Sequence, residues 1–175
     1  MTAFHEHLDD RGLKPWIKSW VDDASEAVTF PLYHGGIMVG YQRYRWMGDK
    51  SPHNKEHGRY YTWISEAYRT VTLYGTDNCC GHGPLFVTEG VWDALRVTAC
   101  WVDCVALLTC SPHHQLKQWL RMYAGRRPIV LLADSDGKMG EWGDYRFLPP
   151  DGAKDANELS HERCFEWVTK IKEFL

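Results

Sequence analysis

The sequence predicts an α/β fold with a mostly parallel sheet and helices on both of its faces, preceded by a small β-rich subdomain. From Leu85 onward, short apolar runs alternate with amphipathic stretches, the pattern of βαβ units. Two of these runs end directly in acidic residues, at Glu89 and at Asp134. Before Leu85, β-rich segments alternate with glycine-rich turns.

The bulk composition suits one compact domain, or a small domain with an appended lobe. The chain has 175 residues, 44% of them hydrophobic, and a net charge of −3. This charge argues against a protein that coats nucleic acid through charge alone, although local basic patches remain open. Nine Trp and nine Tyr are many for this length. Core packing is the interpretation for most of them, and stacking on bases is the alternative.

Targeting and redox signals are absent from the sequence. The opening MTAFHEHLDD is polar and acidic, and no apolar run approaches membrane-spanning length. We therefore expect a cytoplasmic protein with no membrane partner. The six Cys include no C-x-x-C pair, so no zinc site is predicted and the thiols are expected to be reduced.

Residues 1–27 are expected to form a separate N-terminal segment. Its apolar residues from Trp16 to Val21 are spaced i, i+1, i+4, i+5, which predicts a short amphipathic helix opening near Pro15. This helix is expected to dock on the main body.

Residues 28–82 are expected to form the β-rich subdomain. A β-hairpin is predicted over Val28–Trp46, with its turn at a glycine pair. A polar loop is expected over Met47–Gly58, followed by strands at Arg59–Ile64 and Thr70–Tyr74 and a connector to Gly83.

Two arginines on the second hairpin strand are candidate phosphate ligands. Arg43 and Arg45 are expected on one face of that strand, together with Tyr41, because side chains alternate along a strand. Guanidinium groups in such a row suit phosphate. A solvated strand face is the alternative.

Residues 83–175 are expected to form the parallel-sheet domain. The predicted strands are Leu85–Thr88, Cys104–Leu108 and Ile129–Ala133, and the helices between them are Val91–Trp101 and His114–Tyr123. Right-handed crossovers place the first strand between the other two.

The end of the chain is predicted to return to the sheet. Gly137–Asp144 is too short for a crossover helix, so Tyr145–Leu148 is expected to be a short or antiparallel edge strand. A polar loop follows at Lys154–Leu159, and Ser160 caps a final helix with an apolar stripe.

The acidic residues at the strand ends predict a metal site. Asp134 and Asp136 point to the same side of an extended tip, and Asp93 looks back toward Glu89 from one helical turn away. If the two strands are neighbours, Glu89, Asp134 and Asp136 converge, and they repel unless a cation joins them. Hard oxygen ligands suit magnesium or manganese. For any single acid, a solvated loop residue or helix N-cap is the alternative.

Several motifs together resemble a known family. VTEGVWDAL, LLADSDG and KDANEL resemble the Toprim domain of topoisomerases, bacterial-type primases and related nucleases. GYQRYR and the stretch from RYYTW to TLYG extend the likeness to the primase part of phage primase–helicase proteins. The resemblance runs from Val28 to the end. It implies a DNA primase core, a DNA-directed RNA polymerase that makes short RNA primers on single-stranded DNA by magnesium-dependent nucleotidyl transfer.

The resemblance also implies roles for the matching residues. The catalytic set would be Glu89, Asp134 and Asp136, and these three with Asp93 would form the metal group. Nucleoside triphosphate contacts would come from Arg43, Arg45, Lys154 and Asp155. The implied partners are a single-stranded DNA template and ribonucleotides. Because no G-x-x-x-x-G-K-[ST] motif is present, a replicative helicase would be a separate chain, and the location would be the host cytoplasm if a phage encodes the protein.

Some features depart from the family pattern. In DSDGKMG the expected glycine is displaced to Gly140, no helix follows this motif, and no zinc-binding module precedes the domain. A Toprim nuclease and a non-catalytic replication module therefore remain as alternatives. Template contact is expected from a basic group whose members are Lys117, Arg121, Arg126 and Arg127. The alternative interpretation of this group is a solvated helix end without a role in binding.

Overall fold

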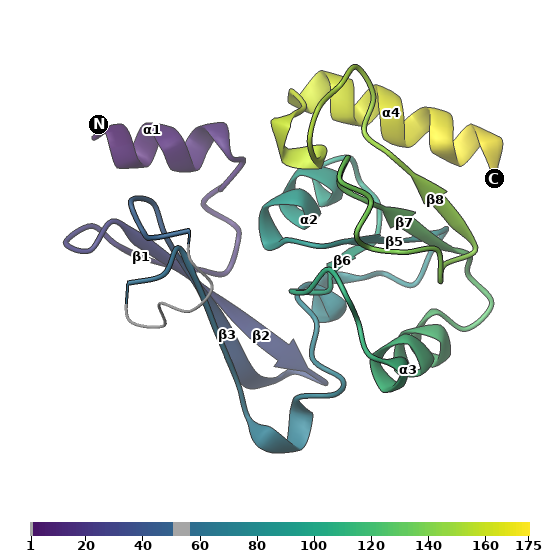
Figure 1. The fold of residues 1–175 in the computed structure, drawn as a ribbon, viewed down its shortest axis with the longest axis horizontal. Coiled ribbons are helices and arrows are strands. Elements are labelled where there is room, and N and C mark those ends of the chain that lie inside the picture. Colours follow the sequence, from purple (N-terminus) through teal and green to yellow (C-terminus); the bar gives the residue numbers. More distant parts are fainter. Residues whose placement is uncertain (1, 51–56) are drawn as a thin grey trace. The chain divides into compact units, whose positions relative to one another are not determined.

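The computed structural model describes residues 2–50 and 57–175 and has a mixed α/β fold (Figure 1). Two compact units are present, one ending at Thr72 and the other comprising Leu73–Leu175. The boundary predicted from the sequence lies later, before Gly83. Leu73 belongs to the second unit because its side chain is fully buried in that core, and Tyr74 forms an antiparallel bridge with Ala106. The strand expected over Thr70–Tyr74 is reduced to this single bridge.

The first unit is built on a four-stranded antiparallel sheet in the order β1-β2-β3-β4. Its strands are β1 (Trp20–Asp22), β2 (Ala27–His34), β3 (Ile37–Arg45) and β4 (Tyr60–Ile64). The predicted hairpin is confirmed in β2 and β3. Its turn residues Gly35 and Gly36 have φ of 57° and 79°, a conformation that other residues rarely adopt. Residues 51–56 of the expected polar loop lie outside the described residues.

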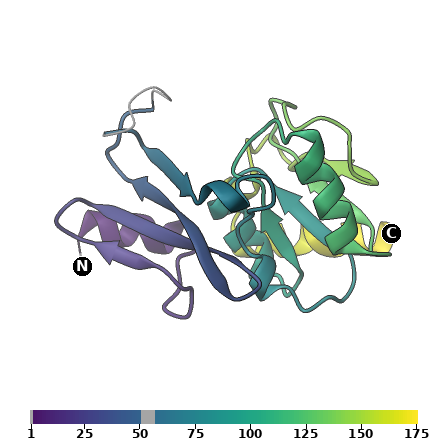
Figure 2. The same cartoon turned by 90° about the horizontal axis from the view of Figure 1, so that it is seen from below.

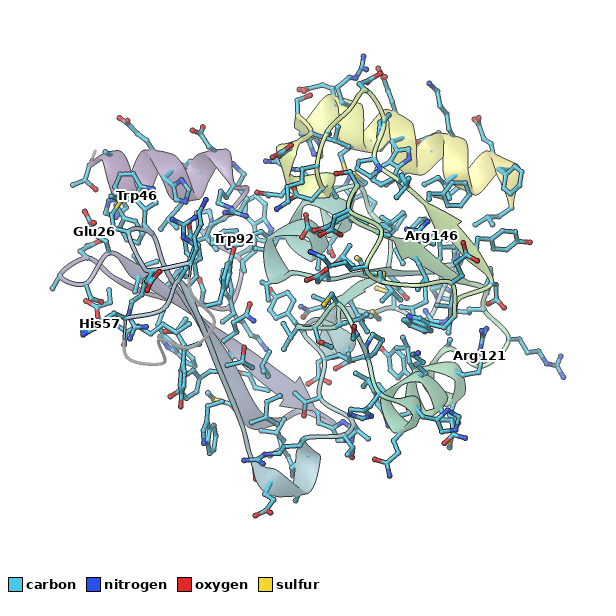
Figure 3. All side chains as sticks on the ribbon, in the orientation of Figure 1. Glu26, Trp46, His57, Trp92, Arg121 and Arg146 are labelled. Carbon is cyan, nitrogen blue, oxygen red and sulfur yellow. The ribbon has the colours of Figure 1, made fainter. Side chains whose placement is uncertain are left out.

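Helix α1 (Ala3–Asp10) lies along one side of this sheet (Figure 1). Its buried residues Phe4 and Leu8 are four apart, so they share one helix face. Trp46, labelled in Figure 3, stacks on the ring of Phe4. The helix expected near Pro15 is wrong. Trp20 begins β1 instead, because the spacing that fits a helix here also fits a turn followed by a strand.

The second unit is built on a four-stranded parallel sheet in the order β6-β5-β7-β8. Its strands are β5 (Leu85–Thr88), β6 (Cys104–Ala106), β7 (Ile129–Leu132) and β8 (Tyr145–Phe147). All residues of β5, β6 and β7 are buried. The predicted central place of β5, between β6 and β7, is confirmed.

Helices cover both faces of the parallel sheet, as predicted. They are α2 (Val91–Thr98), α3 (His114–Ala124) and α4 (His161–Phe174). Helices α2 and α4 cover one face and α3 covers the other (Figures 1 and 2). Short 3-10 helices occur at Glu66–Tyr68, Thr76–Asn78 and Ala156–Glu158, labelled η1, η2 and η3. No helix in residues 2–50 and 57–175 is long and apolar enough to cross a membrane.

Strand β8 pairs with β7 in parallel, so the antiparallel alternative is wrong. The connection from Ala133 to Asp144 has about a dozen residues, the length at which a parallel return becomes feasible, and it contains no helix. It passes over the α3 face, where Met139 is buried and Trp142 is partly buried. Gly143 allows this close passage, since a Cβ there would lie 2.6 Å from Leu131 Cγ.

Candidate active site

The two acidic strand ends lie at the same edge of the parallel sheet. Strands β5 and β7 pair directly, with Leu85 opposite Ile129. Because both strands run the same way, Glu89 after β5 and Asp134 after β7 follow neighbouring carboxyl ends. Glu89 and Asp134 are both half-buried. Open α/β sheets bind their ligands at this edge.

The electrostatics indicate that these carboxylates interact. Burial, then the charges of Glu89 and Asp155, raise the pKa of Asp134 from 3.8 to about 6, and Lys154 partly offsets them. Burial and the charge of Asp136 likewise raise the pKa of Glu89. Carboxylates that raise each other's pKa favour a nearby cation.

The tip after β7 is a turn and not the extended segment that the sequence suggested. The Gly137 N–H donates to the Asp134 carbonyl at 2.9 Å, and Gly137 has a φ of 70°. The chain reverses there, so the two-residue strand period does not relate Asp136 to Asp134. Asp136 is exposed and accepts an ion pair from Lys138 Nζ at 2.8 Å. This ammonium lowers the pKa of Asp136.

The predicted polar loop Lys154–Leu159 lies against this turn. The Ser135 N–H donates to the Lys154 carbonyl at 2.7 Å. Asp155 caps the 3-10 helix η3 by accepting from the Glu158 N–H at 3.0 Å. Lys154 Nζ lies 4.0 Å from the Asp155 carboxylate. Lys154 and Asp155 therefore belong to the same site as Asp134.

Asp93 connects helix α2 to this loop. Its Oδ1 accepts from the Asn157 N–H at 3.0 Å, and the Asn157 side-chain amide donates to the Trp92 carbonyl at 3.3 Å. Asp93 lies in the first turn of α2, as the sequence predicted. The observed bonds give it a structural contact with the loop.

The donor chemistry at this edge fits a divalent cation. The nearby groups are carboxylates without Cys or His, which suits magnesium or manganese. Asp136 is already paired with one positive charge, the Lys138 ammonium. Within the described ranges, however, no three acidic, His or Cys side chains stand in a ligand arrangement. The carboxylates would therefore need to rotate toward an ion.

Arg43 and Arg45 belong to the first unit. They line one groove with Tyr41, so the predicted shared face is confirmed. Arg43 Nη2 pairs with the Asp22 carboxylate at 2.9 Å and contacts Ser25 Oγ at 2.6 Å. Arg45 Nη1 donates to the Gly58 carbonyl at 3.2 Å.

The proposed basic group on the second unit is partly engaged elsewhere. Arg121 pairs with Asp144 at 2.5 Å, and Arg127 pairs with Asp103 at 2.6 Å. The Arg127 side chain is only 14% exposed, so its ion pair with Asp103 has a structural role.

Two residues of the site were missed from the sequence. Lys138 is one, although it follows Asp136 by two positions and its N–H donates to that carboxylate. Asn157 is the other, and it lies in the KDANEL segment that carried the resemblance. Short-range Asx turns provide a signal for Lys138. No local signal identifies the contact between Asn157 and α2.

This fold, with an antiparallel sheet before a parallel one, is the fold of primase catalytic domains. The primase fragment of the bacteriophage T7 primase–helicase protein matches with a TM-score of 0.64 and 17% identity, over 96% of this chain and 70% of that one. The RNA polymerase domain of Mycobacterium tuberculosis primase DnaG matches with a TM-score of 0.61 and 19% identity. That match covers 98% of this chain and 62% of the other.

A third similar structure is a DnaG primase catalytic domain bound to single-stranded DNA, with a TM-score of 0.61 and 18% identity. It matches over 97% of this chain and 60% of that one. This chain thus spans less than two thirds of the DnaG domains compared. No protein-family model matches the chain, and no curated protein matches its sequence. The comparisons therefore establish the fold.

Proposed function

We propose that this protein is the core of a DNA primase, with a Toprim-type domain in its second unit. It would synthesise short RNA primers on a single-stranded DNA template from nucleoside triphosphates. The observation that carries the proposal is the pair of acidic strand ends on β5 and β7. Burial, then the charges of Glu89 and Asp155, raise the pKa of Asp134 there to about 6. The primase fold supports the proposal.

The catalytic role is assigned to Glu89, Asp134 and Asp136. These carboxylates, supported by Asp93, would hold magnesium or manganese. When bound, the divalent ions supply charge neutralisation at the α-phosphate and at the attacking and leaving oxygens. Glu89, with its raised pKa, is suited to accept the proton of the primer 3′-hydroxyl. The new bond joins that oxygen to the α-phosphorus, and pyrophosphate leaves.

The cationic residues are assigned to nucleotide phosphates. Lys154 lies beside the carboxylates and would neutralise the leaving pyrophosphate. Arg43 and Arg45 present guanidinium groups on one strand face of the first unit and would contact nucleotide phosphates. Asp155 fixes the loop that carries Lys154. A replicative helicase, where one takes part, would be a separate chain.

Primer synthesis from labelled ribonucleotides on single-stranded DNA tests this assignment. Wild-type protein with magnesium should synthesise labelled primers. Glu89→Gln and Asp134→Asn should each lower the rate of synthesis at least about 100-fold, in line with the loss of a proton acceptor or charge stabiliser. Asp9→Asn, an exposed acid of α1, serves as the control. Equal product from wild type and variants would reject the proposal. Degradation of the template without added nucleotides would point to the nuclease instead.

A further inference from the structure

The sheet of the first unit has one covered face and one open face. Helix α1 covers the face that carries Val28, Phe30 and Tyr44, and His7 Nε2 lies 2.7 Å from the Tyr44 hydroxyl there. Strand alternation and the observed register place Thr29, Tyr41 and Arg43 on the opposite face.

Aromatic and basic side chains gather on this open face. They line a groove of about 310 Å³, a size typical of small-ligand sites. Its lining residues are Trp20, Thr29, Met38, Tyr41, Arg43, Arg45 and Tyr61. The lining comes from all four strands, so the groove belongs to the sheet as a whole and not to one loop.

Exposed rings continue the groove along β4. Trp63 is directly opposite Tyr41 in the strand register, and the two rings are 5.8 Å apart with an interplanar angle of 28°. The Tyr61 ring is 6.1 Å from Tyr41 on the other side. Trp63 is 48% exposed and Trp20 is 54% exposed. Contiguous exposed aromatic surface is uncommon on monomeric proteins and indicates a binding site.

The charges on this face distinguish a nucleic acid from an apolar protein partner. Arg43 and Arg45 lie beside the rings, and the Arg45 guanidinium donates to the neutral Gly58 carbonyl. Asp22 neutralises part of Arg43 at one edge. Flat rings beside guanidinium groups provide stacking for bases and ion pairs for phosphates.

We propose that this face is a stacking platform for the bases of single-stranded DNA, centred on Tyr41 and Trp63. The proposal rests on the proposed function, for which it names the surface that holds the template. The phosphates that Arg43 and Arg45 contact would then be those of the template strand. A single strand and a free nucleotide offer the same phosphate chemistry to the arginines. The rings separate the two ligands, because successive bases of a strand can occupy several rings at once.

Binding of a fluorescent dT15 oligonucleotide to the whole chain tests the platform. Anisotropy is measured in EDTA, without nucleotides. Tyr41→Ala and Trp63→Ala should each weaken binding roughly 5- to 100-fold, the effect of losing one stacked base. Trp101→Asn is the control, since Trp101 is 90% exposed on the second unit and Asn tolerates its φ of 61°. Its affinity should equal the wild type.

Other arms of the experiment test competing explanations. Trp20→Ala, on β1, provides a second variant should Tyr41→Ala fail to fold. Wild-type affinity in all folded ring variants would overturn the proposal, as would tighter binding of a DNA duplex than of dT15. Equal losses of ATP and dT15 binding in Trp63→Ala would indicate a nucleotide pocket and also overturn it.

The outcome is separable from that of the proposed function. Binding in EDTA does not depend on the carboxylates, so the platform can be confirmed in a protein that makes no primers. Conversely, Glu89→Gln can abolish primer synthesis while Trp63→Ala binds dT15 normally. That result would retain the primase and reject the platform.

Discussion

Asp134 is ionised at neutral pH although its surroundings oppose the charge. Burial and the charges of Glu89 and Asp155 raise its pKa from 3.8 to about 6. The protonated form therefore contributes stability that is present at low pH and is lost as the pH rises from about 4 to about 6. At neutral pH, without a cation, this carboxylate destabilises the folded state.

Removing the Asp134 charge should therefore stabilise the metal-free protein. We expect Asp134→Asn to raise the free energy of unfolding by about 1 kcal/mol at pH 7.5, after allowance for solvent screening of a half-buried group. The difference from wild type should shrink at pH 5, where the wild-type carboxyl is mostly protonated in the folded state. Thermal unfolding in EDTA, followed by circular dichroism, measures both values. A lower melting temperature for the variant at pH 7.5 would contradict this expectation.

Substitutions of Asp93 test whether this residue holds the Asn157 loop in place or ligates a metal ion. Its Oδ1 accepts from the Asn157 N–H, and Asn at position 93 would keep that acceptor. We expect Asp93→Asn to retain primer synthesis within a few-fold, and Asp93→Ala to lose about 1–2 kcal/mol of stability through the unpaired N–H. Chemical denaturation and the primer assay give the two readouts. A large loss of activity in a stable Asp93→Asn protein would instead indicate direct metal ligation.

The positions of Glu89 and Asp134 at strand ends could be predicted from the sequence, but the arrangement of their side chains could not. Each acid directly follows an apolar run, so Glu89 and Asp134 could be located at strand ends. The turn at Gly137 and the Lys138 ion pair depend on backbone torsions that apolar periodicity does not encode. The bond from Asn157 to Asp93 links positions 64 residues apart, beyond any local pattern.

At the scale of the elements, the connection from β7 to β8 depends on one close approach. A Cβ at Gly143 would lie 2.6 Å from Leu131 Cγ and 3.0 Å from the Ile129 carbonyl oxygen. We expect Gly143→Ala to destabilise the fold by about 1–3 kcal/mol, because strand β7 is fully buried and cannot move away. Urea unfolding of Gly143→Ala measures this loss.

The control for Gly143 is Glu141→Ala, an exposed position in the same connection. It should change stability by less than about 0.5 kcal/mol. Equal effects of the two substitutions would mean that the connection tolerates a side chain at Gly143.

Elements with strong periodicity were predicted better than those set by tertiary packing. Strands β5, β6 and β7 are apolar apart from Thr88 at the end of β5, so their type and order follow from the βαβ pattern. The parallel direction of β8 was not predicted, because a helix-free connection of about a dozen residues gives no crossover signal. The N-terminal helix was misplaced because the spacing of Trp16, Ile17, Trp20 and Val21 imitates that of a helix.

At the scale of the whole chain, the unit boundary can be tested with fragments. Leu73 is fully buried in the second unit, and Tyr74 exchanges backbone hydrogen bonds with Ala106. A fragment of residues 73–175 should therefore fold, whereas one of residues 83–175 should lose about 3–5 kcal/mol by removing these side chains. Circular dichroism melts of the two fragments make the comparison. Identical melting temperatures would favour the boundary expected from the sequence.

The division into a β-rich part and a parallel-sheet part was predictable, since hydrophobic periodicity changes along the chain. The position of the boundary was not, because Leu73 and Tyr74 read as one more β segment. Only the three-dimensional contacts assign them to the second unit.

The bonds from Asn157 to Trp92 and Asp93 also have a kinetic consequence. They attach the Lys154–Glu158 segment to the first turn of α2, which itself begins just after Glu89. One wall of the candidate site is therefore pre-assembled before any ligand arrives. A nucleotide entering there would order few residues, so stopped-flow association should follow a single exponential whose rate rises linearly with nucleotide concentration.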